Sequence, residues 1–466
     1  MTVPSASPLQ ASPEASLADA LRNTWPLLLG FALIMLGGGL QGTLLGLRAA
    51  IEEFPTLATG LMMSAYYLGF LLGSLATSRL VARVGHIRVF AALTSLASMT
   101  ILVHSVAVDV YAWAALRLLS GICFAGIYIV AESWLNDRAS NQTRGRIFAI
   151  YMMINFAGLA AGQFLLNLAD PALPGLFMLV SVLVSLAAVP LVLSSRQGPS
   201  FSRPAALALP VIYARSPMAV VGVVAAGLSS GAIFGMAAVF AATTGLSVAQ
   251  TASFVAMPIV GAMLLQWPLG LLSDRIDRRR VISLAAGLAL LAALATLWAS
   301  AGSPLFYLSM LLLGGTTLPV YGIAASHLND QLALDEMVAA SSTLILLSGV
   351  GAAAGQLFVS VLMGTLGSVG FLWFFLAVSV VLLGFSVWRL YLSAGPDDDS
   401  KRPWVATRPA VSPVAVEMAT EAQVEAVEAA EAEAVEAEAA EAADAASTAP
   451  EPVKGAGSRP PSGPPA

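Results

Sequence analysis

Long, continuous stretches of apolar residues dominate this chain, and polar residues gather between them. Twelve stretches approach the about 20 residues that an α-helix needs to cross the hydrocarbon core of a bilayer. The short alternating segments of a transmembrane barrel are not found. The pattern therefore predicts twelve membrane-spanning helices, at 26–47, 57–77, 89–108, 110–133, 147–169, 174–193, 218–241, 251–272, 281–301, 304–327, 338–362 and 368–391.

The composition favours a polytopic membrane protein and excludes several kinds of site. Of the 466 residues, 58% are hydrophobic and 11% are charged, whereas a soluble domain has about 25% charged residues. A single cysteine and three scattered histidines argue against disulfides and against a metal site. No phosphate-cradling glycine-rich loop and no catalytic triad are recognisable, so we expect no ATP hydrolysis, no enzyme activity and no cofactor.

The charged residues predict the orientation in the membrane. All 17 basic residues before position 397 are arginines, and 15 of them fall on one side if residues 1–25 are cytoplasmic. The positive-inside rule therefore places both termini in the cytoplasm. The use of arginine with much alanine suggests a GC-rich bacterial genome, and hence the inner (plasma) membrane. The net charge of −5 arises from the region from 397 onward, which has 14 acidic and 5 basic residues.

Changes in composition divide the chain into five parts. The Pro- and Ser-rich start does not resemble a cleaved signal peptide, and the Ala/Glu-rich end lacks a sustained apolar stripe. We predict a cytoplasmic lead-in at 1–25, a first six-helix half at 26–193, a cytoplasmic linker at 194–217, a second six-helix half at 218–392, and an acidic disordered cytoplasmic tail at 393–466.

The two predicted halves repeat each other in sequence. Residues 131–137 (A-E-S-W-L-N-D) return as 324–330 (A-A-S-H-L-N-D), and 160–163 (A-A-G-Q) return as 353–356, both at an offset of 193. Such internal repeats are typical of transporters that bind the substrate between two halves near the bilayer midplane. The repeat thus predicts two pseudo-symmetric six-helix halves.

The loop after the second span of each half carries a motif. Residues 270–279 read G-L-L-S-D-R-I-D-R-R, whereas the first-half copy has Ser78 and Ala82 in place of the glycine and the first aspartate. The second-half copy resembles the G-x-x-x-D-R-x-G-R-R loop of the major facilitator superfamily. The resemblance covers about 26–392 and implies an all-α transporter with two six-helix halves that works by alternating access.

This resemblance also implies a gate at the cytoplasmic ends of the helices, whose contacts we predict to close that side and to hold the outward-facing state. By pseudo-symmetry we expect Asp274 to face Arg144 and Arg146 at the start of the fifth span, next to a helix N-terminus. The first-half loop should likewise face Asp335 and Glu336. The alternative is that these arginines only set the topology. The predicted gate residues are Gly270, Asp274, Arg275, Arg278, Arg279, Arg83, Gly85 and Arg88.

Two charged residues lie inside a predicted span and are not matched by the repeat. Arg117 lies in the fourth span and Glu132 about 22 Å further along the same helix, and their second-half equivalents are Met310 and Ala325. A charge inside a membrane is costly, so it indicates function by default. We predict that Arg117 and Glu132 take part in transport and proton coupling.

Each of these residues also has a structural explanation. Arg117 could pair with a carbonyl group or with Asp109, and Glu132 could be an interfacial carboxylate beside Trp134. The segment from Arg117 to Gly121, R-x-x-x-G, nevertheless resembles the fourth-helix arginine motif that is associated with proton-coupled members of the superfamily.

Further candidates follow from position in the superfamily's fold, because they are polar or small residues within spans that line its cavity. Each of them could instead join two helices. These possible substrate-cavity residues are Gln41, Tyr66, Gly121, Tyr128, Gln163, Gln266, Tyr321 and Gln356.

The sequence therefore predicts a secondary active transporter that moves a small solute, driven by a proton gradient. We expect a monomer in contact with lipid that binds a small-molecule substrate and neither nucleic acid nor metal. One alternative is a multidrug or solute efflux antiporter, although Gln163 follows Gly162 where that branch has proline. The other is a transporter-like sensor or scaffold that acts through its tail.

Overall fold

The computed structural model describes residues 17–138, 143–193, 207–392, 401–404, 407, 414–415, 418–421 and 423–425. Twelve helices of this part are long and apolar enough to cross a membrane, which confirms the predicted all-α class. The first half contains α1 (Leu17–Ile51), α2 (Thr56–Val84), α3 (His86–Val106), α4 (Val110–Arg138), α5 (Arg144–Phe164), the short 3-10 helix Leu165–Leu168 and α6 (Gly175–Leu193).

The second half begins after a short helix that lies within the predicted linker. The elements are α7 (Leu209–Arg215), α8 (Pro217–Thr243), α9 (Val248–Arg275), α10 (Arg278–Trp298), α11 (Pro304–Thr317), α12 (Val320–Asn329), α13 (Leu334–Leu366) and α14 (Gly370–Leu392). The tenth span is divided into α11 and α12 around Pro319, whose ring nitrogen has no proton to donate. Helix α1 begins before the predicted start at 26.

Close helix packing repeats between the halves. A Cβ atom at Gly69 on α2 would lie 2.0 Å from the carbonyl oxygen of Leu118 on α4, and one at Gly261 on α9 would lie 1.9 Å from that of Leu311 on α11. The two pairs are related by the offsets of the sequence repeat. In both halves only glycine permits these backbones to approach so closely.

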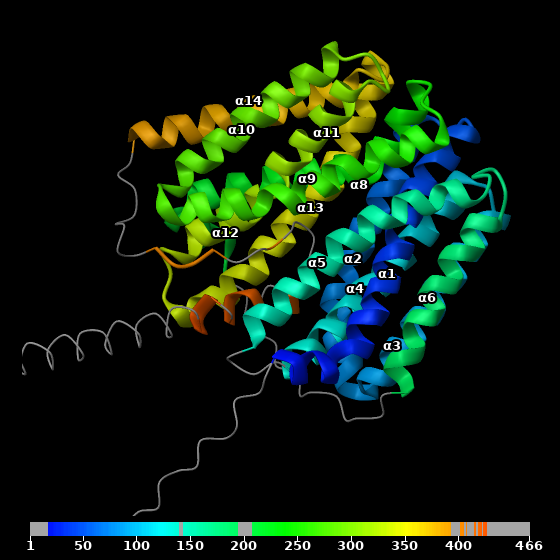
Figure 1. The fold of residues 1–466 in the computed structure, drawn as a ribbon, viewed down its shortest axis with the longest axis horizontal. Helices are drawn as coiled ribbons and strands as arrows, with labels where there is room; N and C mark the ends of the chain where they lie inside the picture. The colour runs from blue at the N-terminus through cyan, green and yellow to red at the C-terminus, as the bar shows by residue number, and fades with distance from the viewer. Residues whose placement is uncertain are drawn as a thin grey trace, which may run out of the picture.

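The halves meet at one end of the bundle and diverge at the other (Figure 1). Helix α1 packs on α8, α2 on α13, and α5 on α9. Near the start of α2, Ser64 donates a hydrogen bond of 2.9 Å to the carbonyl of Ala353, and Gly60 packs on Ser360. The other end carries the loops with most of the arginines, and we call it the arginine-rich end.

Described residues of the tail lie between the halves at the arginine-rich end, where Figure 1 shows them in orange. Ala415 and Met418 are fully buried, and Ala419 is 5% exposed. Glu421 and Glu425 form ion pairs with Arg144 of α5. The tail was predicted to be disordered, whereas these described residues pack against the two halves.

Candidate functional site

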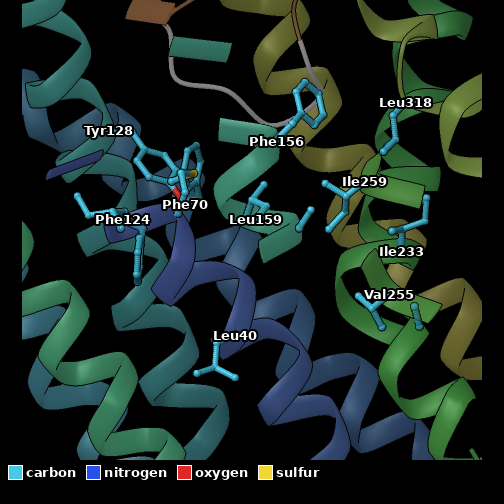
Figure 2. Packing of buried hydrophobic residues seen from close by; sticks show 14 of the residues in the cluster. Leu40, Phe70, Phe124, Tyr128, Phe156, Leu159, Ile233, Val255, Ile259 and Leu318 are labelled. Atoms are coloured by element: carbon cyan, nitrogen blue, oxygen red, sulfur yellow. The ribbon is translucent and has the colours of Figure 1, made fainter. Parts of the chain in front are cut away.

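A cavity lies between the two halves, about midway along the helices. It contains about 790 Å³ of empty space, part of which is open to solvent. Figure 2 shows residues of the first half facing residues of the second half across this region. The lining residues are Gly38, Gly39, Gln41, Gly42, Thr43, Tyr66, Tyr67, Phe70, Arg117, Phe124, Tyr128, Leu159, Gln163, Phe234, Val255 and Gln356.

An aromatic wall from α2 and α4 forms one side of the cavity. The ring of Tyr66 lies 6.3 Å from that of Phe124, and Phe124 lies 6.0 Å from Tyr128. Phe70 completes the group at 5.9 Å from Tyr128. Figure 2 shows Phe70, Phe124 and Tyr128 gathered on one side, with Ile233 and other aliphatic residues of the second half opposite. Such faces pack well against a flat apolar molecule.

Arg117 of α4 borders the cavity and is 5% exposed. Its guanidinium lies 4.4 Å from the centre of the Tyr66 ring, a cation–π contact. Its Nε atom has no hydrogen-bond partner, and no described carboxylate forms an ion pair with it. The alternative of a salt bridge to Asp109 does not occur, because the carboxylate of Asp109 instead accepts from the backbone of Ala112.

Three glutamines place amides on the cavity, and they differ in their partners. Gln163 is engaged, since it donates to the carbonyls of Gly39 (2.9 Å) and Leu159 (3.1 Å) and accepts from Thr43. By contrast, the Nε2 of Gln41 and the Oε1 of Gln356 are buried without a partner. Buried polar atoms of this kind are costly unless a ligand or water satisfies them.

Five of the predicted cavity residues line the cavity, namely Gln41, Tyr66, Tyr128, Gln163 and Gln356, and three do not. Gly121 instead packs against the backbone of Tyr66, where a Cβ atom would lie 2.0 Å from the carbonyl oxygen. Gln266 and Tyr321 are buried elsewhere in the second half. Their polarity made them candidates, but sequence position does not say which way a helical side chain points.

Glu132 lies on α4 toward the arginine-rich end and is 1% exposed. The hydroxyl of Tyr151 on α5 donates to its carboxylate. The ring of Phe31 contacts both Tyr151 (4.5 Å) and the cavity residue Tyr128 (5.7 Å). Aromatic side chains therefore connect this buried carboxylate to the cavity.

The predicted contact of Asp274 with Arg144 and Arg146 is not formed in this conformation. Asp274 forms an ion pair of 3.1 Å with Arg278 and accepts from the backbone N–H of Trp404, at 3.0 and 3.2 Å from its two oxygens. Arg144 pairs with the tail, and Arg146 is exposed. Described residues of the tail instead contact both of these regions.

The most deeply buried ion pair that the loop forms lies within the second half. Arg278 and Asp330, each with a side chain 1% exposed, are 2.7 Å apart. The guanidinium of Arg278 also donates to Ser273 and to the backbone carbonyl of Arg402. Gly270 packs against the ring of Trp404, where any Cβ atom would clash. These residues thus form a seat for the tail.

Arg279 and Asp277 form a second ion pair, at 2.6 Å. Partial burial raises the pKa of Asp277, but the hydrogen bonds and charge of Arg279 lower it by more, so the net pKa lies below its usual range. Arg275 and, in the first half, Arg83, Gly85 and Arg88 are exposed.

The contact predicted between the first-half loop and Glu336 is likewise not formed in this conformation. Arg79 and Arg83 are exposed, whereas Glu336 lies 3.7 Å from Arg215 of α7. The side chain of Asp335 lies outside the described part of the chain. The short helix α7 of the linker, which the prediction did not consider, therefore takes the place of the first-half loop beside Glu336.

Comparison with known proteins identifies the family. The model of the Major Facilitator Superfamily matches residues 27–355 and, in a second match, 218–422. The chain belongs to the major facilitator superfamily. It is thus a membrane transporter and not an enzyme.

This transporter has similar relatives in enteric bacteria. It is 28% identical to an "Uncharacterized MFS-type transporter" of Yersinia pestis (strain Pestoides F) and 26% identical to "Uncharacterized MFS-type transporter YcaD" of Escherichia fergusonii. Each match extends over 340 residues and covers 72% of this chain and 88% of the relative.

Solved structures share the transporter's fold. The nucleoside transporter NupG is 13% identical with a TM-score of 0.67, covering 80% of this chain and 100% of NupG. A bacterial homologue of the human lysosomal transporter Spinster, in an inward-facing and occupied conformation, is 14% identical with a TM-score of 0.65. The match covers 84% of this chain and 99% of the homologue. At these identities the likeness shows the fold alone.

Sequence reasoning missed several residues of this transporter's site. Phe70 and Phe124 were not distinguished from lipid-facing residues of the same spans, because apolar residues face both lipid and cavity. Among the described residues, no group of three His, Cys, Asp or Glu side chains could hold a metal ion. Trp404 was assigned to the tail, and no local signal indicates that it docks on Gly270.

Proposed function

We propose that this transporter is a secondary active transporter that moves a small solute through the central cavity by alternating access. The observation that carries the proposal is the cavity between the halves, bordered by Arg117 without an ion pair. A buried charge that serves only the scaffold is normally paired. An unpaired charge facing a cavity is suited to act on a solute or on a coupled ion.

We assign the arginine-rich end to the cytoplasm of the bacterial inner membrane, with both termini inside, on the positive-inside rule. The direct contacts between Ser64 and Ala353 then lie on the outer side. The described halves diverge on the cytoplasmic side, so the conformation is inward-facing (Figure 1). The proposed unit is a monomer surrounded by lipid, and exposed apolar residues such as Leu291 and Phe358 would contact the lipid.

Proton coupling is assigned to Glu132 together with Arg117. Glu132 is a buried carboxylate that has no counterpart in the second half, and a proton on it removes a charge from a nonpolar environment. Contacts through Tyr151, Phe31 and Tyr128 connect the protonation state of Glu132 to the cavity wall. Arg117 holds the cavity positive, so that movement of a solute and of a proton can depend on each other.

Transport by the purified protein in proteoliposomes tests this function. A panel of metabolites and drugs is presented with and without an imposed pH gradient. We expect gradient-driven flux of at least one compound, and Glu132→Gln should abolish the dependence on the gradient. The matched control is Glu52→Gln, because Glu52 pairs with Arg48 at the opposite end. Flux that ignores the gradient, and is unchanged in Arg117→Ala, would contradict the mechanism.

The same assay separates the alternatives. Efflux of many unrelated drugs would favour the antiporter, whereas a narrow substrate range favours a dedicated solute transporter. Deletion of 397–466 distinguishes a sensor. A transporter retains flux without this region, but a sensor that acts through it loses its function.

A further inference from the structure

The cavity has a net positive charge that no described residue balances. Arg117 is the one charged side chain among its lining residues, and it is 95% buried with its Nε unpartnered. The cation–π contact with Tyr66 offsets only part of the free-energy cost of burying this charge. An anion that enters the cavity would supply the missing ion pair.

The surroundings of Arg117 specify the rest of the ligand. The rings of Tyr66 and Phe124 present apolar faces beside the guanidinium. Further polar contacts are available from the unpartnered amides of Gln41 and Gln356. A cation would be repelled, and a sugar or a neutral drug would stack on the rings but leave Arg117 unpaired.

We propose that the substrate class is a small organic anion with a flat apolar body, such as an aromatic carboxylate. The carboxylate bonds Arg117, the ring packs on the aromatic wall, and Gln41 and Gln356 bond polar substituents. This inference rests on the proposed transport function. It names the substrate of that site without requiring a particular coupling ion.

Binding to the purified protein tests the class with four probes: benzoate, benzamide, acetate and benzylammonium. Benzamide keeps the ring without the charge, acetate keeps the charge without the ring, and benzylammonium reverses the charge. We expect benzoate to bind, and each other probe to bind about tenfold to hundredfold more weakly. Isothermal titration calorimetry supplies the dissociation constants.

Variants locate the binding. Arg117→Gln should make the dissociation constants of benzoate and benzamide equal. Arg117→Lys should restore part of the preference for benzoate. Tyr66→Leu should weaken both probes while the preference for charge persists. Arg48→Gln, at the far end of the first half, is the control that should leave binding unchanged. Elution on size exclusion and the melting temperature show whether each variant is folded.

The outcomes separate this proposal from the proposed function. Benzamide or benzylammonium binding as tightly as benzoate, or no binding of benzoate, overturns the substrate class even if other solutes are transported. Preferred binding of benzoate without gradient-driven flux in proteoliposomes supports the class but contradicts the transport function. A preference for benzoate that persists in Arg117→Gln also overturns the proposal.

A different observation carries a second inference, which concerns the tail. Backbone N–H groups of Arg402 and Trp404 donate to Asp330 (3.1 Å) and Asp274 (3.0 Å). The ring of Trp404 occupies the space left by Gly270 on α9 and contacts Gly322 on α12. The described residues at 401–404 are thereby fixed to the second half.

The following part of the tail connects to both halves. Glu421 and Glu425 pair with Arg144 of α5, whereas Thr420 lies 3.3 Å from Ser341 of α13. Gln423 accepts from Asn329 at 3.0 Å. Since Met418 and Ala415 are fully buried here, this segment fills space that α5 and α13 would need in order to approach.

We infer that the described tail residues at 401–404, 414–415, 418–421 and 423–425 form an autoinhibitory strap. While the strap is bound, it holds the halves apart at the arginine-rich end. The cavity can close there only after Trp404 leaves its seat and the ion pairs with Arg144 break. Release of the strap would therefore increase turnover.

Spin-label distances across the arginine-rich end test the strap. Labels at Arg146→Cys and Arg280→Cys, two exposed positions in a Cys123→Ala background, report the separation of the halves. In Trp404→Ala and in Glu421→Gln/Glu425→Gln we expect about a tenfold increase in the ratio of short to long distances. Flux in proteoliposomes should rise.

The matched control is Trp388→Ala, since Trp388 is a 54% exposed tryptophan on α14 and is not among the residues that hold Trp404. It should leave the distances and the flux unchanged. Unchanged distances in both strap variants, or a flux that falls in them while the protein stays folded, would overturn the inference.

Discussion

The two halves share a packing scheme but place their charges in different regions. Gly69 and Gly261 make the same close contact in each half. The first half carries a cation without an ion pair to a described carboxylate, Arg117 on α4, where the second half has Met310. Conversely, the second half carries the buried pair of Arg278 and Asp330 at the arginine-rich end. A repeated scaffold has thus been specialised, with the buried cation of the cavity in one half and the seat of the tail in the other.

The equivalents of the second-half pair sharpen this contrast. The offsets of 192 and 193 relate Arg278 to His86 and Asp330 to Asp137. The ring of His86 stacks on Trp134 at 6.0 Å instead of forming a bidentate pair. Position in the repeat therefore preserves polarity, but only the second half has a permanent cation there.

The largest expected effect is the loss of the second-half pair. Arg278→Met leaves Asp330 buried without its partner, and breaking a buried pair costs about 3–5 kcal/mol. We expect a marked fall in the melting temperature in detergent, whereas His86→Leu should cost less. Arg278→Met/Asp330→Leu should recover most of the stability. A double variant as unstable as the single one would show that the pair is not the source of the effect.

The next largest effect is expected when the residues at the equivalent positions 117 and 310 are exchanged between the halves. Arg117→Met removes an unpaired buried cation, whose insertion cost is about 2.5–3.5 kcal/mol, so we expect a higher melting temperature together with loss of flux. Met310→Arg should lower the melting temperature, since Met310 is fully buried. If Arg117→Met instead destabilises the protein, Arg117 is part of the scaffold.

Alanine at the paired glycines should affect both halves alike. Gly69→Ala and Gly261→Ala each force a backbone contact apart, and overpacking costs about 1–3 kcal/mol. Thermal unfolding of both variants would measure the symmetry of the scaffold. Gly384→Ala on α14, where no atom lies within 4 Å of the added Cβ, is the control. A large effect in one half and none in the other would contradict symmetric packing.

The sequence was sufficient for the fold because hydrophobic length and the internal repeat determine it. All twelve spans correspond to helices, and the superfamily followed from residues 270–279. The division of the tenth span was not predicted, although Pro319 is visible in the sequence. Helix-breaking residues are common in membrane helices, so one proline does not by itself indicate a break.

The site could be predicted only in part, for a physical reason. Polar residues in apolar spans attract attention because burial is costly, and this signal found Arg117 and five cavity residues. It also selected Gln266 and Tyr321, which do not face the cavity. The contacts of the tail with Asp274 and Arg144 were not predicted, because the residues that make them lie far apart in sequence. Pseudo-symmetry pointed to a contact between Asp274 and Arg144, which is not formed in this conformation.

The smallest expected effect concerns Asp277. Its equivalent in the first half is a glycine, Gly85. The Asp277 carboxylate caps α10 by accepting from the backbone N–H of Arg279 at 2.9 Å. Because the net pKa of Asp277 is lowered in the folded protein, its contribution is fully present above the unfolded pKa of about 3.9. The contribution decreases as the pH falls through the folded pKa.

Asp277→Asn keeps a capping acceptor but removes the charge, so it should cost about 1 kcal/mol or less at pH 7. Melting temperatures of wild type and Asp277→Asn, measured from pH 7 to pH 3, should converge as the pH falls. The other carboxylates titrate in both proteins, so the difference between the two isolates Asp277. Gly85 has no side chain to titrate, and therefore Gly85→Ala should change stability by an amount independent of pH. A gap at Asp277 that widens in acid would mean that the ion pair with Arg279 does not stabilise the fold.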